Sequence, residues 1–440
     1  MITTDQQRFD HLGLAGTPGL RTPHLDQLGR DGVWFRRAYC PSPICTPTRV
    51  SLLTGQYPSS HGAYSIGVSV DPFPGPTLPE VLAGSGYATA LVGKTHFVAR
   101  GDEHAHIRGL PDAADRDFAG WHGPYLGFEH VSVSSGHTIN CVPNMHYREF
   151  LERAGADYRR WFPQMAPGYD NQIAGAWEIP QELHDTHWVA EESMKWLDGQ
   201  SDRPWFLWAS FQDPHEPFVC PEPWFSQVDA DALTPFPGPP DGAFSDRPAF
   251  YGDVLRQGES GWGAIDDGHG VPCIFHWPCM DAQARTALQA TVGMVNFLDD
   301  RIGAIIRRLQ AAGQWENTIV IFTSDHGEMH GHHGYWGKGL MAFEDCQRVP
   351  LLIAGPGVVS GGPTEALASL VDLPRTILSL AGVPAPDVFQ GADLVPILSG
   401  QSASVNDHVF VECEATHRIG QLTCVTDRYK LVVYRDAAEG

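Results

Sequence analysis

The stretch "NTIVIFTSDHG", residues 317–327, joins a run of apolar and β-branched residues to a polar cluster that begins at Ser324. A short apolar run of this kind is typical of a strand buried on both faces, as in a parallel sheet covered by helices. Three segments repeat the pattern: "MITT" before Asp5, "YATALVG" before Lys94 and "WFLWASF" before Asp213. We therefore predict that these four segments are strands of one mostly parallel sheet.

Helical patterns lie between the apolar runs. Residues 285–313 repeat apolar side chains at steps of three and four, and Gly313 can cap the end of that helix. A second helix is expected around residues 370–383. The alternation predicts an α/β fold in which a large, mostly parallel central sheet is sandwiched by helices.

The pattern changes near residue 400. The segments at residues 408–414 and 422–435 have the pattern of two antiparallel strands. We expect one large domain over residues 1–400 and the start of a small C-terminal α+β domain, an antiparallel sheet, over residues 401–440. The chain opens on the last residues of a strand and closes just after one, so both ends are expected to be truncated.

Composition excludes some kinds of partner. The formal net charge of -23 argues against a nucleic-acid partner and against docking on anionic lipid. No apolar run is long enough to span a bilayer. Nine cysteines without regular spacing argue against a disulfide framework and favour a reducing compartment, so the expected location is cytoplasmic.

Polar side chains follow all four predicted strands, where ligands bind in open α/β sheets. Carboxylates with amide and imidazole neighbours could hold a divalent cation, and the lysines, histidines and Arg49 suit a tetrahedral oxyanion such as sulfate or phosphate. The residues concerned are Asp5, Gln6, Lys94, His96, Asp213, His215, Asp325, His326 and Lys338.

The segment "PSPICTPTRVSLLTG", residues 41–55, adds a cysteine to this set. A helix can begin near Pro47 and end at Gly55, so its first N–H groups and its dipole would favour an anion beside Cys45. Arg49, one turn later, can lie on the same face. Taken alone, Cys45 is better explained as an inert buried thiol than as a nucleophile.

The longer segment "CTPTRVSLLTGQYPSSHG" resembles the Cys-x-Pro-x-Arg signature of the sulfatases of the alkaline phosphatase superfamily. The resemblance covers nearly the whole chain, in family order: "TDQQR", "LVGKTHF", "SDHGEMHGHHGYWGKG", "RVPLLIAGPG" and "FQGADLVPILSG". It implies an alkaline-phosphatase-like fold and a sulfuric ester hydrolase acting on a small-molecule or saccharide sulfate ester.

The resemblance also implies a role for each motif residue. A formylglycine-generating enzyme would convert Cys45 to formylglycine, whose hydrated gem-diol is the nucleophile that forms a covalent sulfo-enzyme intermediate. Arg49 would anchor that diol, and His96 would be the base that expels sulfate. Lys94, His215 and Lys338 would hold the sulfate oxygens, and one of them would protonate the leaving alcohol. The ligands of one divalent cation, expected to be Ca²⁺, would be Asp5, Gln6, Asp325, His326 and the modified Cys45.

Two positions depart from the family pattern. Gln6 stands where the family often has aspartate, and His326 stands where it often has asparagine. Both changes lower the negative charge of the site, keep Mn²⁺ or Mg²⁺ open, and resemble the phosphonate monoester and phosphodiester hydrolase branch. The Lys94-x-His96 pair instead resembles the sulfatases. A third hypothesis is a non-catalytic binding protein, against which the intact set of motif residues argues.

Tryptophans gather in the segments that would form the rim of the site. They could stack on a sugar or an aryl group, enclose a quaternary ammonium group, or pack loops onto the core, and the sequence leaves these alternatives open. They include Trp177, Trp224, Trp262 and Trp277.

Overall fold

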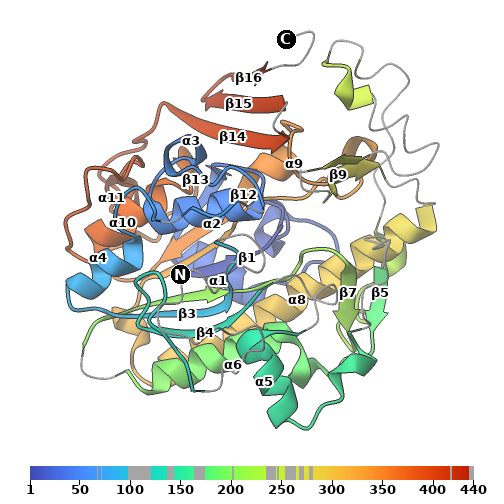
Figure 1. Ribbon diagram of the computed structural model, residues 1–440, viewed down its shortest axis with the longest axis horizontal. Coiled ribbons are helices and arrows are strands. Elements are labelled where there is room, and N and C mark those ends of the chain that lie inside the picture. The colour runs from blue at the N-terminus through green and yellow to red at the C-terminus, as the bar shows by residue number, and fades with distance from the viewer. Residues whose placement is uncertain are drawn as a thin grey trace.

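The structure is a computed structural model that describes residues 1–66, 68–70, 72–97, 120–135, 143–162, 174–200, 203–233, 244, 247–252, 264–266, 272–276, 281–416 and 419–435. Its centre is an eight-stranded sheet (Figure 1). In spatial order the strands are β13 (Gly362–Ser369), β2 (Val33–Tyr39), β12 (Arg348–Ala354), β10 (Val320–Ser324), β1 (Ile2–Thr4), β6 (Trp205–Ser210), β3 (Ala88–Lys94) and β4 (His130–Ser134).

The four strands predicted from the apolar runs are consecutive neighbours in this sheet. Strands β10, β1, β6 and β3 pair in parallel, so their polar carboxyl ends meet at one edge. The prediction of a mostly parallel sheet is confirmed. The exception is β12, which runs antiparallel to both β10 and β2.

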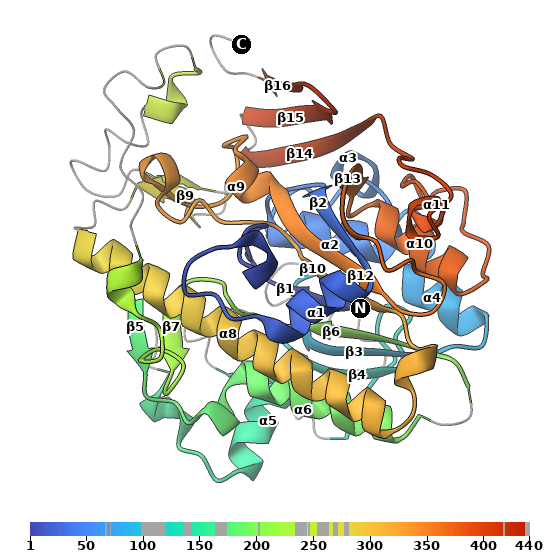
Figure 2. The same cartoon turned by 180° about the vertical axis from the view of Figure 1, so that it is seen from behind.

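Both faces of the sheet are covered by apolar cores, which explains why the strands read as continuous apolar runs. Side chains alternate between the faces, so Leu91 of β3 joins one core while Ala90 and Val92 join the other. Helices α2 (Cys45–Thr54), α4 (Leu78–Gly84) and α10 (Asp372–Leu380) cover the first face. Helices α1 (Pro23–Asp31), α5 (Met145–Arg153), α6 (Asp185–Asp198) and α8 (Asp281–Ala311) cover the second, which faces the viewer in Figure 2.

The two helices predicted by periodicity are present. Helix α8 starts four residues before the expected 285–313 pattern and ends at Ala311, two residues before its end, and α10 lies within 370–383. Gly313 and Gly382 lie just beyond the two helices with φ of 67° and 69°. Their left-handed backbone fits the use of glycine to end a helix.

The C-terminal segments form a small antiparallel sheet of β14 (His408–Thr416), β15 (Ile419–Thr426) and β16 (Lys430–Arg435). The predicted antiparallel sheet is confirmed, but it has three strands where two were expected, because residues 422–435 contain the end of β15 and all of β16. A turn separates them: the Thr426 backbone N–H donates to Tyr429 O at 2.8 Å, and the Tyr429 N–H donates to Thr426 Oγ1 at 2.9 Å. The domain boundary at residue 400 stays a prediction.

Shorter elements complete the described part of the chain. Strand β5 (Ala174–Trp177) pairs with β7 (Phe218–Pro221), and β11 (Tyr335–Gly337) forms a small sheet with β9 (Pro272–His276) and β8 (Ala264–Asp266). Three short helices are α3 (Pro58–His61), α9 (Glu344–Gln347) and α11 (Val395–Leu398).

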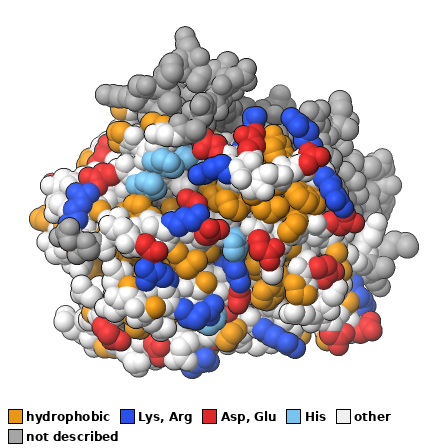
Figure 3. Space-filling model, turned by 90° about the horizontal axis from the view of Figure 1, so that it is seen from below, with side chains coloured by type: hydrophobic (Ala, Val, Ile, Leu, Met, Phe, Trp, Pro, Cys, Tyr) orange, Lys and Arg blue, Asp and Glu red, His pale blue; other side chains and the backbone are white. Residues whose placement is uncertain are grey.

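The distribution of surface charge and the character of the helices can be compared with the expectations drawn from composition about nucleic-acid and membrane partners. Acidic and basic side chains are interspersed with apolar ones over the face in Figure 3, so the acidic excess is not gathered into one patch there. Among the described helices, none has the length and apolar character that a bilayer crossing requires.

Two rim tryptophans pack onto neighbouring rings, Trp177 against Phe162 and Trp224 against Phe297. Trp262 and Trp277 lie outside the described residues.

Candidate active site

Cys45 is the first residue of α2, a helix whose ten residues are all buried. The helix ends as predicted at Gly55, which has φ of 66° and donates its N–H to Ser51 O at 2.8 Å. A side chain at residue 55 would collide with Phe389, because a Cβ there would lie 2.6 Å from Phe389 Cγ. The buried helix and its tightly packed end therefore hold Cys45 at a defined place beside the carboxyl ends of the strands.

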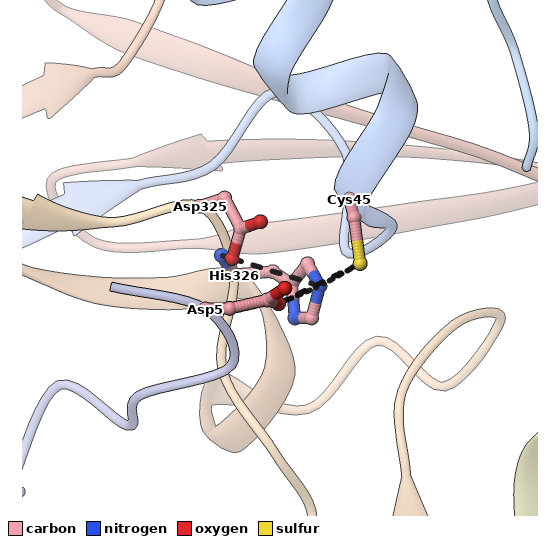
Figure 4. A group of neighbouring side chains, drawn as sticks. All are labelled: Asp5, Cys45, Asp325 and His326. Atoms are coloured by element: carbon pink, nitrogen blue, oxygen red, sulfur yellow. Dashed lines mark hydrogen bonds and ion pairs between the residues drawn. The ribbon is translucent and has the colours of Figure 1, made fainter. Parts of the chain in front are cut away.

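Four of the five predicted cation ligands meet at this place (Figure 4). One ligand atom from each of Asp5, Cys45, Asp325 and His326 lies within 4.8 Å of the others, and all four residues are buried. His326 Nε2 lies 3.6 Å from Asp5 Oδ1 and 3.7 Å from Asp325 Oδ1. Cys45 Sγ lies 3.1 Å from His326 Nε2 and 3.6 Å from Asp5 Oδ1. The four side chains thus converge from three distant parts of the sequence.

The hydrogen bonds of His326 prepare it to bind a cation. Its Nδ1 lies 2.9 Å from Gly327 O, so Nδ1 carries the proton and donates it, and Nε2 is left as the acceptor that faces the two aspartates. Burial lowers the pKa of His326, which keeps the imidazole neutral. Two carboxylates and a neutral imidazole nitrogen form a donor set that fits a divalent cation.

Arg49 lies one helical turn after Cys45 and bridges the cation-ligand cluster to β6. Its Nε donates to Asp325 Oδ2 at 2.8 Å, and its Nη1 donates to Ser210 Oγ at 2.8 Å. Burial opposes the charge of Arg49, but Asp325 and Asp5 raise its pKa, so the guanidinium stays charged. Lys94, at the end of β3, forms an ion pair with Asp5.

A second group of predicted residues reaches the thiol through Lys338. Lys338, which follows β11, lies 3.4 Å from Cys45 Sγ and 2.6 Å from His215 Nε2. His215 Nδ1 lies 2.6 Å from Glu216 O, so Nδ1 donates to that carbonyl and Nε2 accepts from the lysine. Burial opposes the charge of Lys338, but Cys45 and Glu216 raise its pKa. An anion attached to residue 45 would lie within reach of this ammonium group.

The structure adds two buried glutamates that sequence reasoning missed. Gln6 donates from its amide nitrogen to both Glu216 and Glu328, and its amide oxygen accepts from Lys338. Burial and the neighbouring Glu216 raise the pKa of Glu328 to about 8, and burial also raises that of Glu216. Their position inside two site motifs, "DPHEPF" and "SDHGEMH", was the available signal. The role of Gln6 as a cation ligand stays a prediction, since its amide group faces this network.

Two further predicted residues lie near the strand ends. His96 is buried two residues beyond β3 with a left-handed φ of 57°, a conformation that costs energy outside glycine and that clusters at functional sites. Its role as a base stays a prediction. Asp213 turns away from the cation-ligand cluster and packs against His184 and Asp185.

The unmodified thiol of Cys45 is a poor nucleophile where it stands. Burial, followed by the negative charge of Asp5, raises the pKa of Cys45 to about 12. Since the thiolate is the reactive form, a cysteine with this pKa is almost entirely protonated at neutral pH. The arrangement does not suit thiolate catalysis.

Comparison with known proteins identifies the class of site. The sequence model of the family described as sulfatase matches residues 1–383, and a model described as N-sulphoglucosamine sulphohydrolase, C-terminal, matches residues 331–440. The chain is 31% identical to the multifunctional alkaline phosphatase superfamily protein PehA of Trinickia caryophylli, over 91% of this chain and 76% of that protein. It is 30% identical to the choline-sulfatase of Rhizobium meliloti, over 87% of this chain and 67% of that protein.

A solved structure shows the same fold. The phosphonate monoester hydrolase of Agrobacterium radiobacter superposes with a TM-score of 0.77 at 24% identity, over 98% of this chain and 86% of that one. The central sheet between helices is therefore alkaline-phosphatase-like, as predicted. With a family match over most of its length and the motif residues gathered around Cys45, the chain belongs to the sulfatase family and is a sulfuric ester hydrolase.

Proposed function

We propose that the chain hydrolyses a small-molecule or saccharide sulfate ester by covalent catalysis at residue 45, after a formylglycine-generating enzyme has modified Cys45. The observation that carries the proposal is the convergence of Asp5, Asp325, His326 and Lys338 on Cys45. The raised pKa of the thiol supports it, because an unmodified cysteine would be inert here. Formylglycine would supply a hydrated aldehyde whose oxygen attacks sulfur.

The cation would be held by Asp5, Asp325, His326 and residue 45, with Gln6 as a further candidate, and would supply positive charge that activates the nucleophile. Ca²⁺ is our first choice, and the imidazole ligand leaves Mn²⁺ and Mg²⁺ as alternatives. Arg49 would hold residue 45 and Asp325 together, since its guanidinium already donates to that carboxylate.

The remaining cations would bind the sulfate oxygens. Lys94 pairs with Asp5, Lys338 lies beside Cys45, and His215 accepts a hydrogen bond from Lys338. The ammonium group of Lys338, paired with His215, is positioned to give a proton to the leaving alcohol. His96 is proposed as the base of the second step.

The described cysteines are free thiols, which supports the proposed reducing, cytoplasmic compartment.

A second candidate is a phosphonate monoester or phosphodiester hydrolase. The residue type of Gln6 favours it, because an amide in place of a carboxylate lowers the negative charge around the nucleophile. The name of the relative PehA, a multifunctional protein, is consistent with activity on more than one ester.

The test is an assay of matched aryl sulfate, phosphate diester and phosphonate monoester substrates with the wild-type chain and with Cys45→Ala. The proposal expects the sulfate to turn over fastest and the Cys45→Ala variant to lose turnover. Faster turnover of the phosphonate would select the second candidate, and undiminished turnover by Cys45→Ala would remove residue 45 from the mechanism. The mass of the peptide that contains residue 45 reports directly whether an aldehyde has replaced the thiol.

A further inference from the structure

Two buried glutamates beside the active site have no role in the mechanism proposed above. Glu216 follows β6 and Glu328 follows β10, and the two residues are 5% and 2% exposed. Both accept a hydrogen bond from the amide nitrogen of Gln6, which follows β1. A buried carboxylate is costly unless it is paired and hydrogen-bonded, so two of them beside one amide group call for an explanation.

The partners of Gln6 fix the orientation of its amide group. The amide nitrogen donates to Glu216 and to Glu328, and the amide oxygen accepts from the ammonium group of Lys338. The reversed amide would set its oxygen against two carboxylates and its NH₂ group against an ammonium group, so all three contacts would be lost. The two glutamates therefore hold the amide oxygen of Gln6 towards Lys338.

The backbone of Gln6 is held in place as well as its side chain. The Gln6 backbone N–H donates to Asp325 Oδ1 at 3.1 Å, and the φ of Gln6 is 65°. This left-handed conformation costs energy outside glycine and persists only where the surroundings impose it. The amide group thus extends from a fixed backbone, and its hydrogen bonds to the glutamates restrict the rotation that remains.

The ammonium group of Lys338 is held by two acceptors, and Glu216 contacts the residues that supply both. Lys338 Nζ donates to Gln6 Oε1 and to His215 Nε2, the latter at 2.6 Å, and lies 3.4 Å from Cys45 Sγ. His215 Nδ1 lies 2.6 Å from Glu216 O and 3.2 Å from Glu216 Oε2. Glu216 therefore orients the imidazole through Nδ1 and the amide through its nitrogen.

Glu328 reaches Lys338 through a side chain and through the backbone. Its Oε2 accepts from Gln6, and its Oε1 accepts the backbone N–H of Gly337 and, at 3.1 Å, that of His330. These three partners are all donors, as an ionised carboxylate requires. The carboxylate of Glu328 thus joins the loop after β10 to Gly337, the last residue of β11, and Lys338 comes directly after it.

We propose that Glu216 and Glu328 are positioning residues that hold the ammonium group of Lys338 beside residue 45. The inference rests on the proposed function, in which Lys338 gives a proton to the leaving alcohol. In that step sulfur bonds to the nucleophilic oxygen at residue 45, its bond to the alcohol oxygen breaks, that oxygen keeps the electron pair, and Lys338 Nζ supplies the proton. A displaced ammonium group protonates the alcohol less well, so the esters whose leaving group most needs a proton are affected most.

The test is Glu328→Gln, which replaces one carboxylate oxygen by a donor of similar size. The new amide oxygen can keep the hydrogen bonds from Gly337 and His330, which leaves its NH₂ group facing the NH₂ group of Gln6. Two donors cannot pair, so Gln6 turns or withdraws its amide and Lys338 loses that acceptor. The measurement is kcat/KM with phenyl sulfate and with nitrophenyl sulfate, because nitrophenolate leaves readily without a proton and phenolate does not.

We expect Glu328→Gln to lose about 10-fold to 100-fold in kcat/KM with phenyl sulfate and less than about 3-fold with nitrophenyl sulfate. The matched control is Asp299→Asn, because Asp299 is 1% exposed and accepts the backbone N–H groups of His24 and Leu25 at 3.2 Å and 2.8 Å. This control reports what a lost buried carboxylate does through stability, and it should affect both substrates equally. Equal losses with the two substrates in Glu328→Gln, or no loss, overturn the proposal.

Crystal structures of the wild type and of Glu328→Gln are the second arm, which does not depend on turnover. The proposal expects Lys338 Nζ in the variant to lie beyond hydrogen-bond distance of Gln6 and farther from residue 45 than in the wild type. An ammonium group that keeps both contacts overturns it. A wild type that hydrolyses neither sulfate refutes the proposed function instead, and the two structures still decide whether Glu328 positions Lys338. Glu216→Met, which removes the other acceptor of the Gln6 amide, replaces Glu328→Gln in both arms if the latter does not fold.

Discussion

Replacing Arg49 by methionine tests whether the guanidinium holds the active site together. Arg49 is 0% exposed and donates to Asp325 at 2.8 Å and to Ser210 at 2.8 Å, with Asp5 Oδ2 at 3.8 Å from its Nη2. Methionine keeps much of the volume of the side chain and removes the charge. The substitution therefore leaves two buried carboxylates without this cationic partner.

The expected loss in the free energy of unfolding of Arg49→Met follows from the burial of the side chain. Breaking a buried ion pair by removing one partner costs about 3–5 kcal/mol, because the other charge is left uncompensated in a low dielectric. The lost hydrogen bond to Ser210 adds about 1 kcal/mol. Since domains are stable by only about 5–15 kcal/mol, the variant is expected to lose a large fraction of its stability. A cation bound at Asp5 and Asp325 would offset part of this loss.

The assay is urea unfolding of Arg49→Met with chelator and, separately, with divalent cation. The matched control is Ser210→Ala, which removes the hydroxyl partner of Arg49 and leaves both ion pairs, so it should lose about 1 kcal/mol. We expect a loss of about 4–6 kcal/mol for Arg49→Met in chelator and a smaller loss with the cation. A loss in chelator no larger than that of Ser210→Ala would refute the reasoning.

Two further predictions concern the surroundings of α2. Burial lowers the pKa of His61 to about 4, and its neutral imidazole accepts the Ala63 N–H at Nδ1 (3.1 Å) and contacts Ser51 Oγ at 3.0 Å. The unfolded chain binds the extra proton between pH 6.5 and 4, so wild-type stability should fall by about 3 kcal/mol from this group as the pH drops through that window. His61→Gln should show a correspondingly shallower dependence in unfolding measured from pH 4 to 7, and an unchanged slope would contradict the assignment. Gly55→Ala should destabilise by roughly 2–5 kcal/mol, combining the cost of a left-handed residue with the collision against Phe389. Gly313→Ala has the same φ and open space around its Cβ, so it should show the backbone cost of about 1–2 kcal/mol alone, and equal thermal shifts for the two variants would exclude the collision.

Local sequence patterns were sufficient to predict the four central strands, α2, α8 and the residues at the strand ends. The reason is that the signals are local: a run buried on both faces is apolar throughout, and Gly55 and Gly313 end helices through their own backbone conformation. Because parallel strands end at one edge, the order of strands and polar residues along the chain is enough to predict that Asp5, Lys94 and Asp325 meet.

Only the tertiary structure decided what these side chains contact. The antiparallel direction of β12 has no local signature, since its residues are as apolar as those of the mutually parallel strands β10 and β3. Glu216 and Glu328 read as ordinary charged residues of loops, yet packing buries both against the amide of Gln6. Asp213 stands at a strand end like Asp5, but the chain entering α6 places His184 beside it and directs it to a separate cluster. Burial and charge compensation depend on neighbours that are distant in sequence. Periodicity and motifs could therefore predict that polar groups gather at this edge of the sheet. The tertiary structure alone determined which of these groups form ion pairs and hydrogen bonds with one another.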